Sequence, residues 1–237
     1  MFRVSLMAAA LLAIVGSTAA ADTLVDNLSE PTRGVTILGV TDPDRIWVAQ
    51  SFYTPERVRL DQISVLAGVS PDGADAVAEL RSGVDPSGPA ITSLDMSALD
   101  AEALGIVSLV PQTQVVLEPG VQYWIVLGTA TTGAFGWAYA EGNVTVGPGT
   151  LAEYSYSDDS GVSWGPAGTD NPHQVNVEVT LFCPADFDGN GTVAVPDIFA
   201  FLSAWFAQDP RADFDDDGTI AVPDIFAFLS AWFAGCP

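Results

Sequence analysis

The sequence DFDGNGTVAVPDIFAFLSAWFA at residues 186–207 recurs as DFDDDGTIAVPDIFAFLSAWFA at residues 213–234. Each copy opens with the pattern D-x-[DN]-x-[DN]-G, has an aspartate at its twelfth position and continues into an apolar run. Because the repeat has constant spacing, we interpret each copy as one structural unit, a polar loop followed by a single helix.

Each loop has the residue types that a calcium site requires. Calcium takes about six to eight oxygen ligands, so a loop must bring several carboxylates and a carbonyl group to one point. A glycine at the sixth position permits the sharp turn that this needs. The sequence therefore predicts two calcium ions, held by Asp186, Asp188, Asn190, the carbonyl of Thr192 and Asp197, and by Asp213, Asp215, Asp217, the carbonyl of Thr219 and Asp224.

The two predicted sites differ in charge. Asp217 stands where the first loop has Asn190, so the second loop has one more carboxylate and is predicted to bind calcium more tightly. Without metal the carboxylates repel one another, which would make metal binding part of folding. A polar turn that binds nothing is the alternative for one loop alone, and the second copy in the same register argues against it.

The apolar run after each loop predicts one helix per copy. Pro196 and Pro223 suit a first helical turn, and no helix can precede either loop. In the first copy Ile198, Phe201, Leu202 and Trp205 share one helical face. Two interpretations stay open: the two helices bury their aromatic residues on each other, or part of the apolar surface stays exposed as a docking patch.

The duplicated loop–helix of residues 183–237 resembles the type I dockerin module of exported bacterial proteins. The ending Gly235-Cys236-Pro237 further resembles the dockerin-like C-terminal anchors of exported proteins from planctomycete-type bacteria. The resemblance implies docking to a cohesin-like or other surface receptor. In cellulosomal dockerins, loop positions 10 and 11 help to choose the cohesin, and valine–proline pairs replace the usual hydroxyl pair here. The candidate partner-binding residues are Val195, Pro196, Phe199, Phe206, Val222, Pro223, Phe226 and Phe233.

Cys183 and Cys236 are the only cysteines, and they bracket this module. A disulfide between them would close a loop of about 50 residues and stabilise the fold by roughly 4 kcal/mol in the chain-entropy model. Two free thiols are the alternative, which an exported chain disfavours.

The first 21 residues predict a secretory signal peptide. Arg3 supplies a positive charge, residues 4–16 are apolar, and small residues at 17–21 offer cleavage sites. No later stretch is long enough to cross a bilayer. We therefore expect a secreted protein, extracellular or held at the cell surface. The chain has a net charge of −23 and no lysine, which argues against nucleic acid and anionic lipid as partners.

Residues 22–182 predict a mainly β domain, an antiparallel sandwich or jelly roll, because short apolar strands alternate with Gly/Pro turns. Residues 97–104 are expected to form one helical turn. The stretches 47–52, 60–64 and 117–124 resemble the choice-of-anchor β-domain of exported bacterial proteins, type R. That resemblance implies a domain carried by a C-terminal anchor. The predicted strands are 47–54, 59–69, 106–117, 121–127, 135–141, 151–156 and 175–181.

Residues 157–164 fit the Asp-box pattern S-x-D-x-G-x-[ST]-W, which occurs once in this chain. A propeller would need the pattern in successive blades, so we interpret it as a structural hairpin. In that hairpin Asp159 would accept backbone N–H bonds, Gly161 would adopt a positive φ and Trp164 would pack beneath.

The residues do not predict an enzyme. His173 is the only histidine, and the nucleophile-elbow, zinc-protease and phosphate-loop motifs are absent. Glycosidases need only two carboxylates, so a pair such as Glu141 and Glu153 leaves glycoside hydrolysis as the one plausible class.

Two functions from different classes follow. The first is a non-catalytic exported protein whose β-domain is held at the cell surface by a calcium-loaded tail. The second is an accessory of polysaccharide breakdown, a process with which dockerins in general are associated. Its sugar-stacking candidates would be exposed aromatic residues. These candidates are Trp137, Tyr139, Tyr154, Tyr156 and Trp164. Burial of most of them in the core is the alternative.

Overall fold

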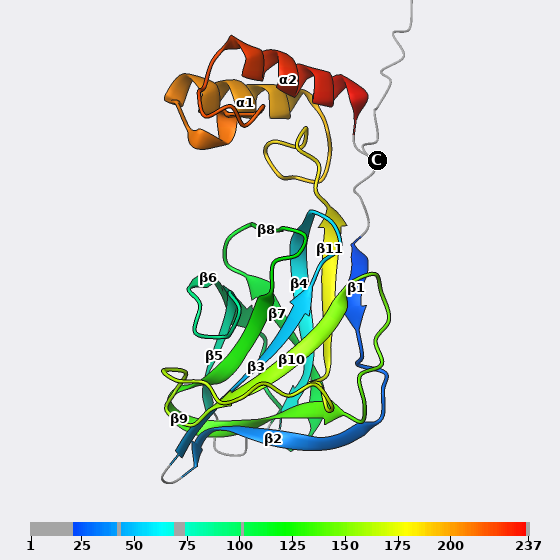
Figure 1. Cartoon of the computed structure of the whole chain (residues 1–237), viewed down its shortest axis with the longest axis vertical. Helices are drawn as coiled ribbons and strands as arrows, with labels where there is room; N and C mark the ends of the chain where they lie inside the picture. The colour runs from blue at the N-terminus through cyan, green and yellow to red at the C-terminus, as the bar shows by residue number, and fades with distance from the viewer. Residues whose placement is uncertain (1–20, 42–43, 69–73, 101, 236–237) are drawn as a thin grey trace, which may run out of the picture. The chain divides into compact units, whose positions relative to one another are not determined.

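The computed structural model describes residues 21–41, 44–68, 74–100, 102–235. The chain divides after Phe182 into two compact units, a β unit that ends at this residue and a helical unit that begins at Cys183 (Figure 1). Almost all of the predicted signal peptide lies outside the described residues, as does Cys236. None of the described helices is long and apolar enough to span a membrane.

The β unit confirms the prediction of a mainly β domain. Val175–Leu181 was predicted as a strand and is one, whereas the predicted strand 106–117 is divided between two strands. Residues 97–100 and 102–104 include no helical turn, so that prediction was wrong. The strands are β1 (Asp22–Asp26), β2 (Thr32–Thr41), β3 (Asp44–Tyr53), β4 (Val58–Gly68), β5 (Ala74–Ser82), β6 (Ala90–Met96), β7 (Leu104–Pro111), β8 (Val115–Leu117), β9 (Tyr123–Ala140), β10 (Thr150–Ser157) and β11 (Val175–Leu181).

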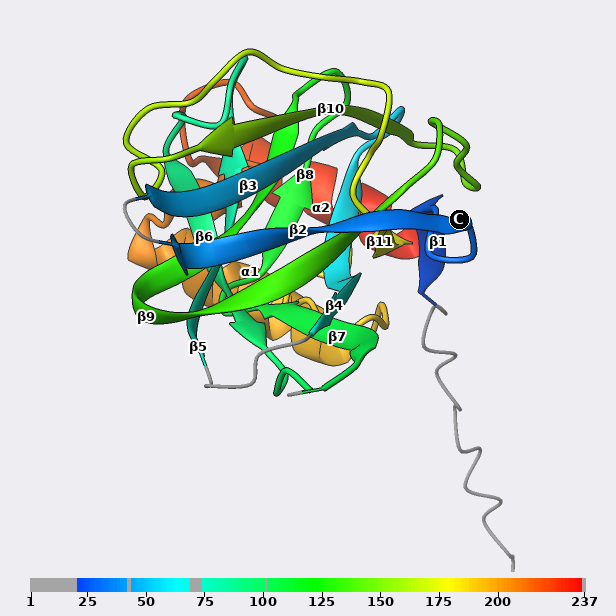
Figure 2. The same cartoon turned by 90° about the horizontal axis from the view of Figure 1, so that it is seen from below.

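Strand β9 decides the architecture. It runs for 18 residues and joins two stretches that the sequence predicted as separate strands. Its first half pairs with β5 and β3, and its second half pairs with β2 and β4. Figure 2 shows β9 curving round until it runs beside β2.

The β4–β9 pairing closes the sheet. Strands β4, β7, β6, β5 and β9 pair in turn and return to β4, which forms a five-stranded barrel. The predicted sandwich or jelly roll is therefore corrected to a barrel. Because β9 bends, its two halves can pair with strands on different sides of the barrel. The local apolar pattern from which we predicted a sandwich does not show such a bend.

The main core of the β unit is built from apolar residues of all eleven strands. Trp137, counted among the exposed aromatic candidates in the sequence, lies in this core with no exposed surface. Its indole N–H donates to the carbonyl of Gln174 at 3.1 Å. Residues 123–129 and 135–138 of β9 are all buried, so both halves of this strand are covered on both faces.

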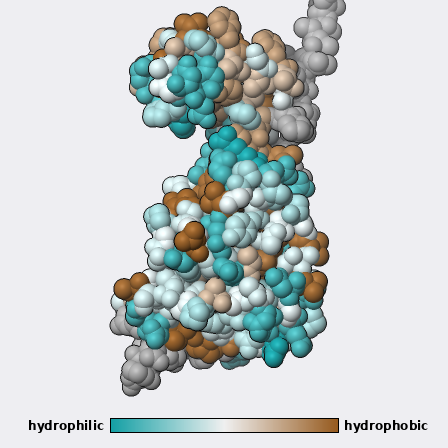
Figure 3. Space-filling model, viewed as in Figure 1, coloured by the Kyte–Doolittle hydropathy of each residue, from teal (hydrophilic) through white to brown (hydrophobic). Residues whose placement is uncertain are grey.

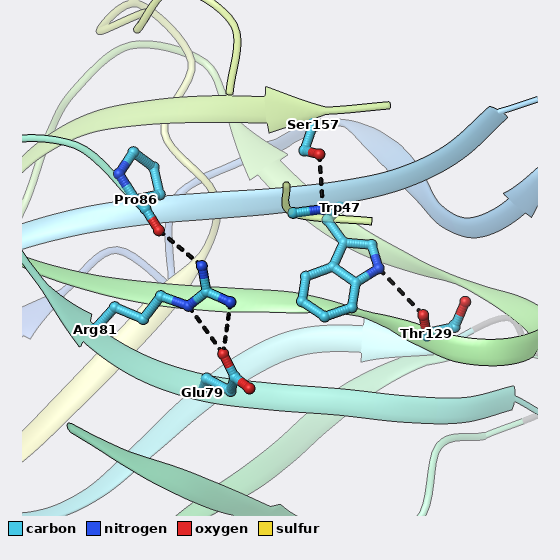
Figure 4. Close-up of polar contacts among 7 residues, drawn as sticks. Trp47, Glu79, Arg81, Pro86, Thr129 and Ser157 are labelled. Atoms are coloured by element: carbon cyan, nitrogen blue, oxygen red, sulfur yellow. Dashed lines mark hydrogen bonds and ion pairs between the residues drawn. The ribbon is translucent and has the colours of Figure 1, made fainter. Parts of the chain in front are cut away.

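A second, smaller apolar cluster lies on the opposite face of β3 and β9, around Trp47 and Trp124. The Trp47 indole N–H donates to the carbonyl of Thr129 at 3.1 Å (Figure 4). On β5, Arg81 bonds Glu79 at 2.8 Å and the carbonyl of a nearby loop proline at 2.9 Å. The contact with the proline carbonyl holds the loop that follows β5 against this strand.

The predicted Asp-box hairpin is confirmed. Asp159 Oδ1 accepts two backbone N–H bonds, at 3.1 and 2.8 Å, and the hydroxyl of Ser157 at 2.8 Å. Gly161 has a φ of 78°, and the partly buried Trp164 packs against the cluster around Trp47. The pattern therefore has a structural role here, as a cap over the outer cluster.

The helical unit contains two 13-residue α-helices of identical sequence, α1 (Val195–Ala207) and α2 (Val222–Ala234), with the short 3₁₀ helix η1 (Pro210–Ala212) between them. Phe201 and Phe228 are fully buried and stack with ring centroids 4.3 Å apart and planes 4° from parallel. Phe187 and Phe214, from the two loops, contact both rings edge-on. The equivalent residues of the two copies thus meet at the centre of the unit.

Candidate metal centre

Each loop is closed by the aspartate at its twelfth position, which is also the third residue of the following helix. Asp197 and Asp224 are buried, with at most 1% of their surface exposed. Their Oδ2 atoms accept the backbone N–H of Ala194 at 2.8 Å and of Ala221 at 2.7 Å. These bonds satisfy a donor that a helix start leaves unpaired, and they hold each carboxylate against its loop.

The first loop is folded by its own predicted ligands. Asp186 Oδ2 accepts the N–H of Gly191 at 2.8 Å, and Asp188 Oδ1 accepts the N–H of Asn190 at 3.1 Å. Asn190 Oδ1 accepts the N–H of Thr192 at 2.9 Å. Such short-range bonds are typical of Asx turns, and they wind the backbone round the side-chain oxygens.

The second loop repeats this pattern. Asp213 Oδ2 accepts the N–H of Gly218 at 3.0 Å, and Asp215 Oδ1 accepts the N–H of Asp217 at 3.3 Å. Asp217 Oδ1 accepts the N–H of Thr219 at 2.8 Å. The sequence difference between Asn190 and Asp217 therefore leaves the loop conformation unchanged.

Two positions in each loop require a positive φ. The sixth residues, Gly191 and Gly218, have φ of 86° and 87°. The fourth residue is Gly189 in the first loop, with a φ of 74°, and Asp216 in the second, with a φ of 59°. Because aspartate tolerates this region less well than glycine does, the second loop contains local strain that the first lacks.

Three carboxylates converge in each loop, Asp186, Asp188 and Asp197 in the first and their equivalents Asp213, Asp215 and Asp224 in the second. One oxygen from each member lies within 4.8 Å of those of the other two. Calcium–oxygen bonds of about 2.3–2.6 Å place oxygens on opposite sides of an ion about 4.6–5.2 Å apart, so the spacing and the all-oxygen donors fit calcium.

The remaining predicted ligands stay predictions. The three carboxylates that converge in the second loop do not include Asp217, whose Oδ1 accepts the hydroxyl of Thr219 at 2.6 Å. Its charge still lies beside the group, so the prediction of tighter binding in the second loop rests on that charge. The carbonyls of Thr192 and Thr219 remain candidates for the seventh position.

The carboxylates of the second loop oppose one another electrostatically. Loss of hydration, followed by the charges of Asp217, Asp224 and Asp213, raises the pKa of Asp215 above its usual value. The pKa of Asp224 is lowered instead, chiefly by the N–H bond from Ala221. A cation at the centre of the group would relieve the repulsion at Asp215 while leaving the backbone bonds of Asp224 in place.

The two loops are connected crosswise by tryptophan. The indole N–H of Trp205, on α1, donates to the carbonyl of Ala221 in the second loop at 2.9 Å. The indole of Trp232, on α2, donates to the carbonyl of Ala194 in the first loop at 3.0 Å. From sequence, Trp205 was predicted only as an apolar-face residue. The repeat places a tryptophan at the same position in both helices. The sequence does not show that each tryptophan donates to the loop of the other copy.

The candidate partner-binding residues lie at the surface of the helical unit. Phe199 and Phe206 are 65% and 76% exposed, and Phe226 and Phe233 are 66% and 78% exposed. In each helix these residues follow the exposed first valine at helical spacing. The inner aromatic residues therefore pack together as the first interpretation expected, while these four remain exposed, and their use in docking stays a prediction. The set Val195, Pro196, Phe199, Phe206 and its equivalent Val222, Pro223, Phe226, Phe233 is exposed throughout.

Cys183 is disulfide-bonded and is not a free thiol. Cys236, its predicted partner, lies outside the described residues, so the Cys183–Cys236 bond stays a prediction. Comparison of the chain with models of known protein families finds no match, and a search of curated proteins finds none either.

Proposed function

We propose that the helical unit is a dockerin-like, calcium-binding docking module that attaches an exported β-domain to a receptor at the cell surface. The observation that carries the proposal is the pair of equivalent carboxylate groups, each with three oxygens within 4.8 Å of one another. A single acidic turn is common in proteins without a metal. Two turns with the same internal hydrogen bonds, closed by buried aspartates, are better explained by a ligand common to both.

The proposed docking surface is duplicated like the loops. Val195, Phe199 and Phe206 form one apolar stripe along α1, and Val222, Phe226 and Phe233 form the same stripe along α2. Figure 3 shows apolar residues, coloured brown, at the surface of the helical unit. Exposed aromatic side chains in equivalent positions suit contact with another protein, because aromatic residues supply large contact areas at interfaces.

A non-catalytic role for the β unit is supported by its only histidine. His173 is fully buried, and burial lowers its pKa to about 3. An effective general base at neutral pH is accessible to its substrate and has a pKa near that pH. His173 is buried and its pKa is far below neutrality, so it meets neither condition. We therefore propose a displayed binding or structural domain, carried by the calcium module, on an exported protein.

Calorimetric titration of the full chain with calcium tests the module. We expect two binding steps, one lost in Asp186→Ala and the other lost in Asp213→Ala. Asp216→Asn is the matched control, because it removes one charge from the second loop at a position outside the predicted ligand set. Absence of calcium-dependent heat at millimolar metal, or equal loss in Asp216→Asn and Asp213→Ala, would refute the calcium site.

Retention in an exporting host tests the docking role. Residues 183–237 fused to an exported fluorescent reporter should stay with the cells and be released by a calcium chelator. Phe199→Ala combined with Phe226→Ala should release the reporter while preserving calcium binding. Release of the unaltered fusion under all conditions would remove the anchor role and leave the tail as a folding cap.

A further inference from the structure

The β unit has a cluster of tyrosines that its barrel core does not need. Tyr139 on β9 and Tyr154 and Tyr156 on β10 converge on His173, with ring centroids 6.1, 5.8 and 6.0 Å from the imidazole. Beneath them Trp137 and His173, both without exposed surface, lie 4.6 Å apart. Tyr156 is 37% exposed, and the other two tyrosines are partly exposed. The three tyrosine rings therefore pack on buried residues and are partly exposed at the surface.

Polar bonds set the orientation of these rings. The Tyr154 hydroxyl donates to Asp170 Oδ1 at 2.7 Å. Thr36 bonds the Tyr156 hydroxyl, and its own hydroxyl lies 3.2 Å from His173 Nε2. Side chains that are already held in place lose little conformational entropy when a ligand binds, which favours recognition by preformed aromatic surfaces.

Charged and amide groups lie next to the tyrosines. Arg33 donates to Asn171 Oδ1 at 3.1 Å and lies 3.8 Å from Glu141, with both charged side chains more than half exposed. The pKa of Asp170 is lowered chiefly by the hydrogen bond from Tyr154 and also by the positive charge of Arg33. Carboxylate, amide and guanidinium groups can donate to or accept from adjacent hydroxyl groups of one ligand.

A cavity of about 350 Å³ adjoins the cluster. Tyr156 belongs to both the cluster and the cavity wall, and Trp164, Asp158 and Ser163 also line the cavity. The volume lies at the small end of the range of about 300–1,000 Å³ that is typical of small-molecule sites. An opening with aromatic, hydroxyl and carboxylate groups suits a ring that is apolar on its faces and polar at its edge.

We propose that the surface formed by Tyr139, Tyr154 and Tyr156, with the adjoining cavity, binds a neutral sugar unit of a polysaccharide. A pyranose has C–H groups on its faces, and these pack on aromatic rings. The hydroxyl groups at its edge can form hydrogen bonds with the polar side chains next to the tyrosines. The net charge of −23 disfavours polyanionic glycans. This inference does not depend on the calcium module.

Calorimetry of the full chain with cellohexaose, xylohexaose, mannohexaose and laminarihexaose tests the proposal, with polygalacturonate as the anionic counterpart. At least one neutral oligosaccharide should bind, and Tyr156→Ala should weaken its binding about tenfold, the size expected for one lost aromatic contact. Tyr156→Phe, which keeps the ring, should retain most of the affinity. Ile106→Ala, at an exposed apolar residue of β7 outside the proposed surface, is the control and should change nothing.

Thermal unfolding of each variant separates lost binding from lost folding, and Asp170→Ala offers a second variant that keeps all three rings. It should weaken binding while the barrel stays folded. Absence of binding to all four neutral sugars at millimolar concentration, preference for polygalacturonate, or binding unchanged in both Tyr156→Ala and Asp170→Ala would overturn the proposal.

Discussion

The crosswise tryptophan bonds lead to a prediction about which loop each helix supports. Trp205 donates to Ala221 of the second loop at 2.9 Å, and Trp232 donates to Ala194 of the first at 3.0 Å. Phenylalanine at either position keeps an aromatic ring but removes the N–H. The half-buried carbonyl then lacks its partner, which costs about 1–2 kcal/mol. If folding of a loop and metal binding are coupled, this becomes about a 5- to 30-fold loss of calcium affinity.

The loops have to be measured separately. In an Asp186→Ala background the remaining step belongs to the second loop, and Trp205→Phe should weaken it by that factor while Trp232→Phe changes it little. In an Asp213→Ala background the two substitutions should exchange roles. Calorimetric titration with calcium gives both affinities, and the two tryptophan variants are each other's control because the helices have the same sequence.

The prediction depends on each tryptophan supporting the loop of the other copy. If each tryptophan variant weakened the loop that precedes it in sequence, the coupling would run along the chain and our account would be wrong. Equal weakening of both loops would mean that the indoles act only through the general stability of the unit. No change in either background would mean that the carbonyls bond water equally well.

Three smaller predictions concern single residues. Burial holds the pKa of His173 at about 3, below its unfolded value of about 6.5, so the β unit should lose about 2 kcal/mol of stability between pH 7.5 and pH 5, and denaturant unfolding of His173→Gln should lack this slope. Asp216→Gly should stabilise the metal-free helical unit by roughly 0.5–1 kcal/mol and Gly189→Asp should destabilise it by a similar amount in thermal melts, because both positions need a positive φ. The bonds from Ser163, then that from Ser157, lower the pKa of Asp159 to about 2, so the hairpin should loosen only as the pH falls from about 4 towards 2, and NMR titration of this carboxyl would show a normal value if the hairpin bonds were absent in solution.

The strand pattern predicted most of the β unit but not how it closes. The alternation of Val175–Leu181 and the apolar run 121–127 identified real strands, because burial of one or both faces leaves a local pattern. The pattern did not predict that Tyr123–Ala140 is one strand, because its exposed middle looks like a turn between two strands. Closure into a barrel depends on that bend, so the predicted sandwich was wrong.

The same contrast applies to the helical unit. The predicted helices are confirmed at Val195–Ala207 and Val222–Ala234, and each begins with the predicted proline in its first turn. The stacking of Phe201 on Phe228 was foreseen only as mutual burial of aromatic residues. Helical spacing separated Phe201, on the predicted inner face, from Phe199, a predicted surface residue, and the structure confirms this, since Phe201 is fully buried and Phe199 is 65% exposed.

The sequence by itself determined the identity of the acidic loop residues, the two helices and the Asp-box hairpin. In these elements the interacting groups lie within about a dozen residues, so local backbone preferences and hydrogen bonds suffice to bring them together. Only the tertiary structure decided the barrel closure, the crosswise tryptophan bonds and the tyrosine cluster on His173. Their members are far apart in the chain, and they meet because strand register, the bend of β9 and the pairing of the two copies position them, which no local pattern records.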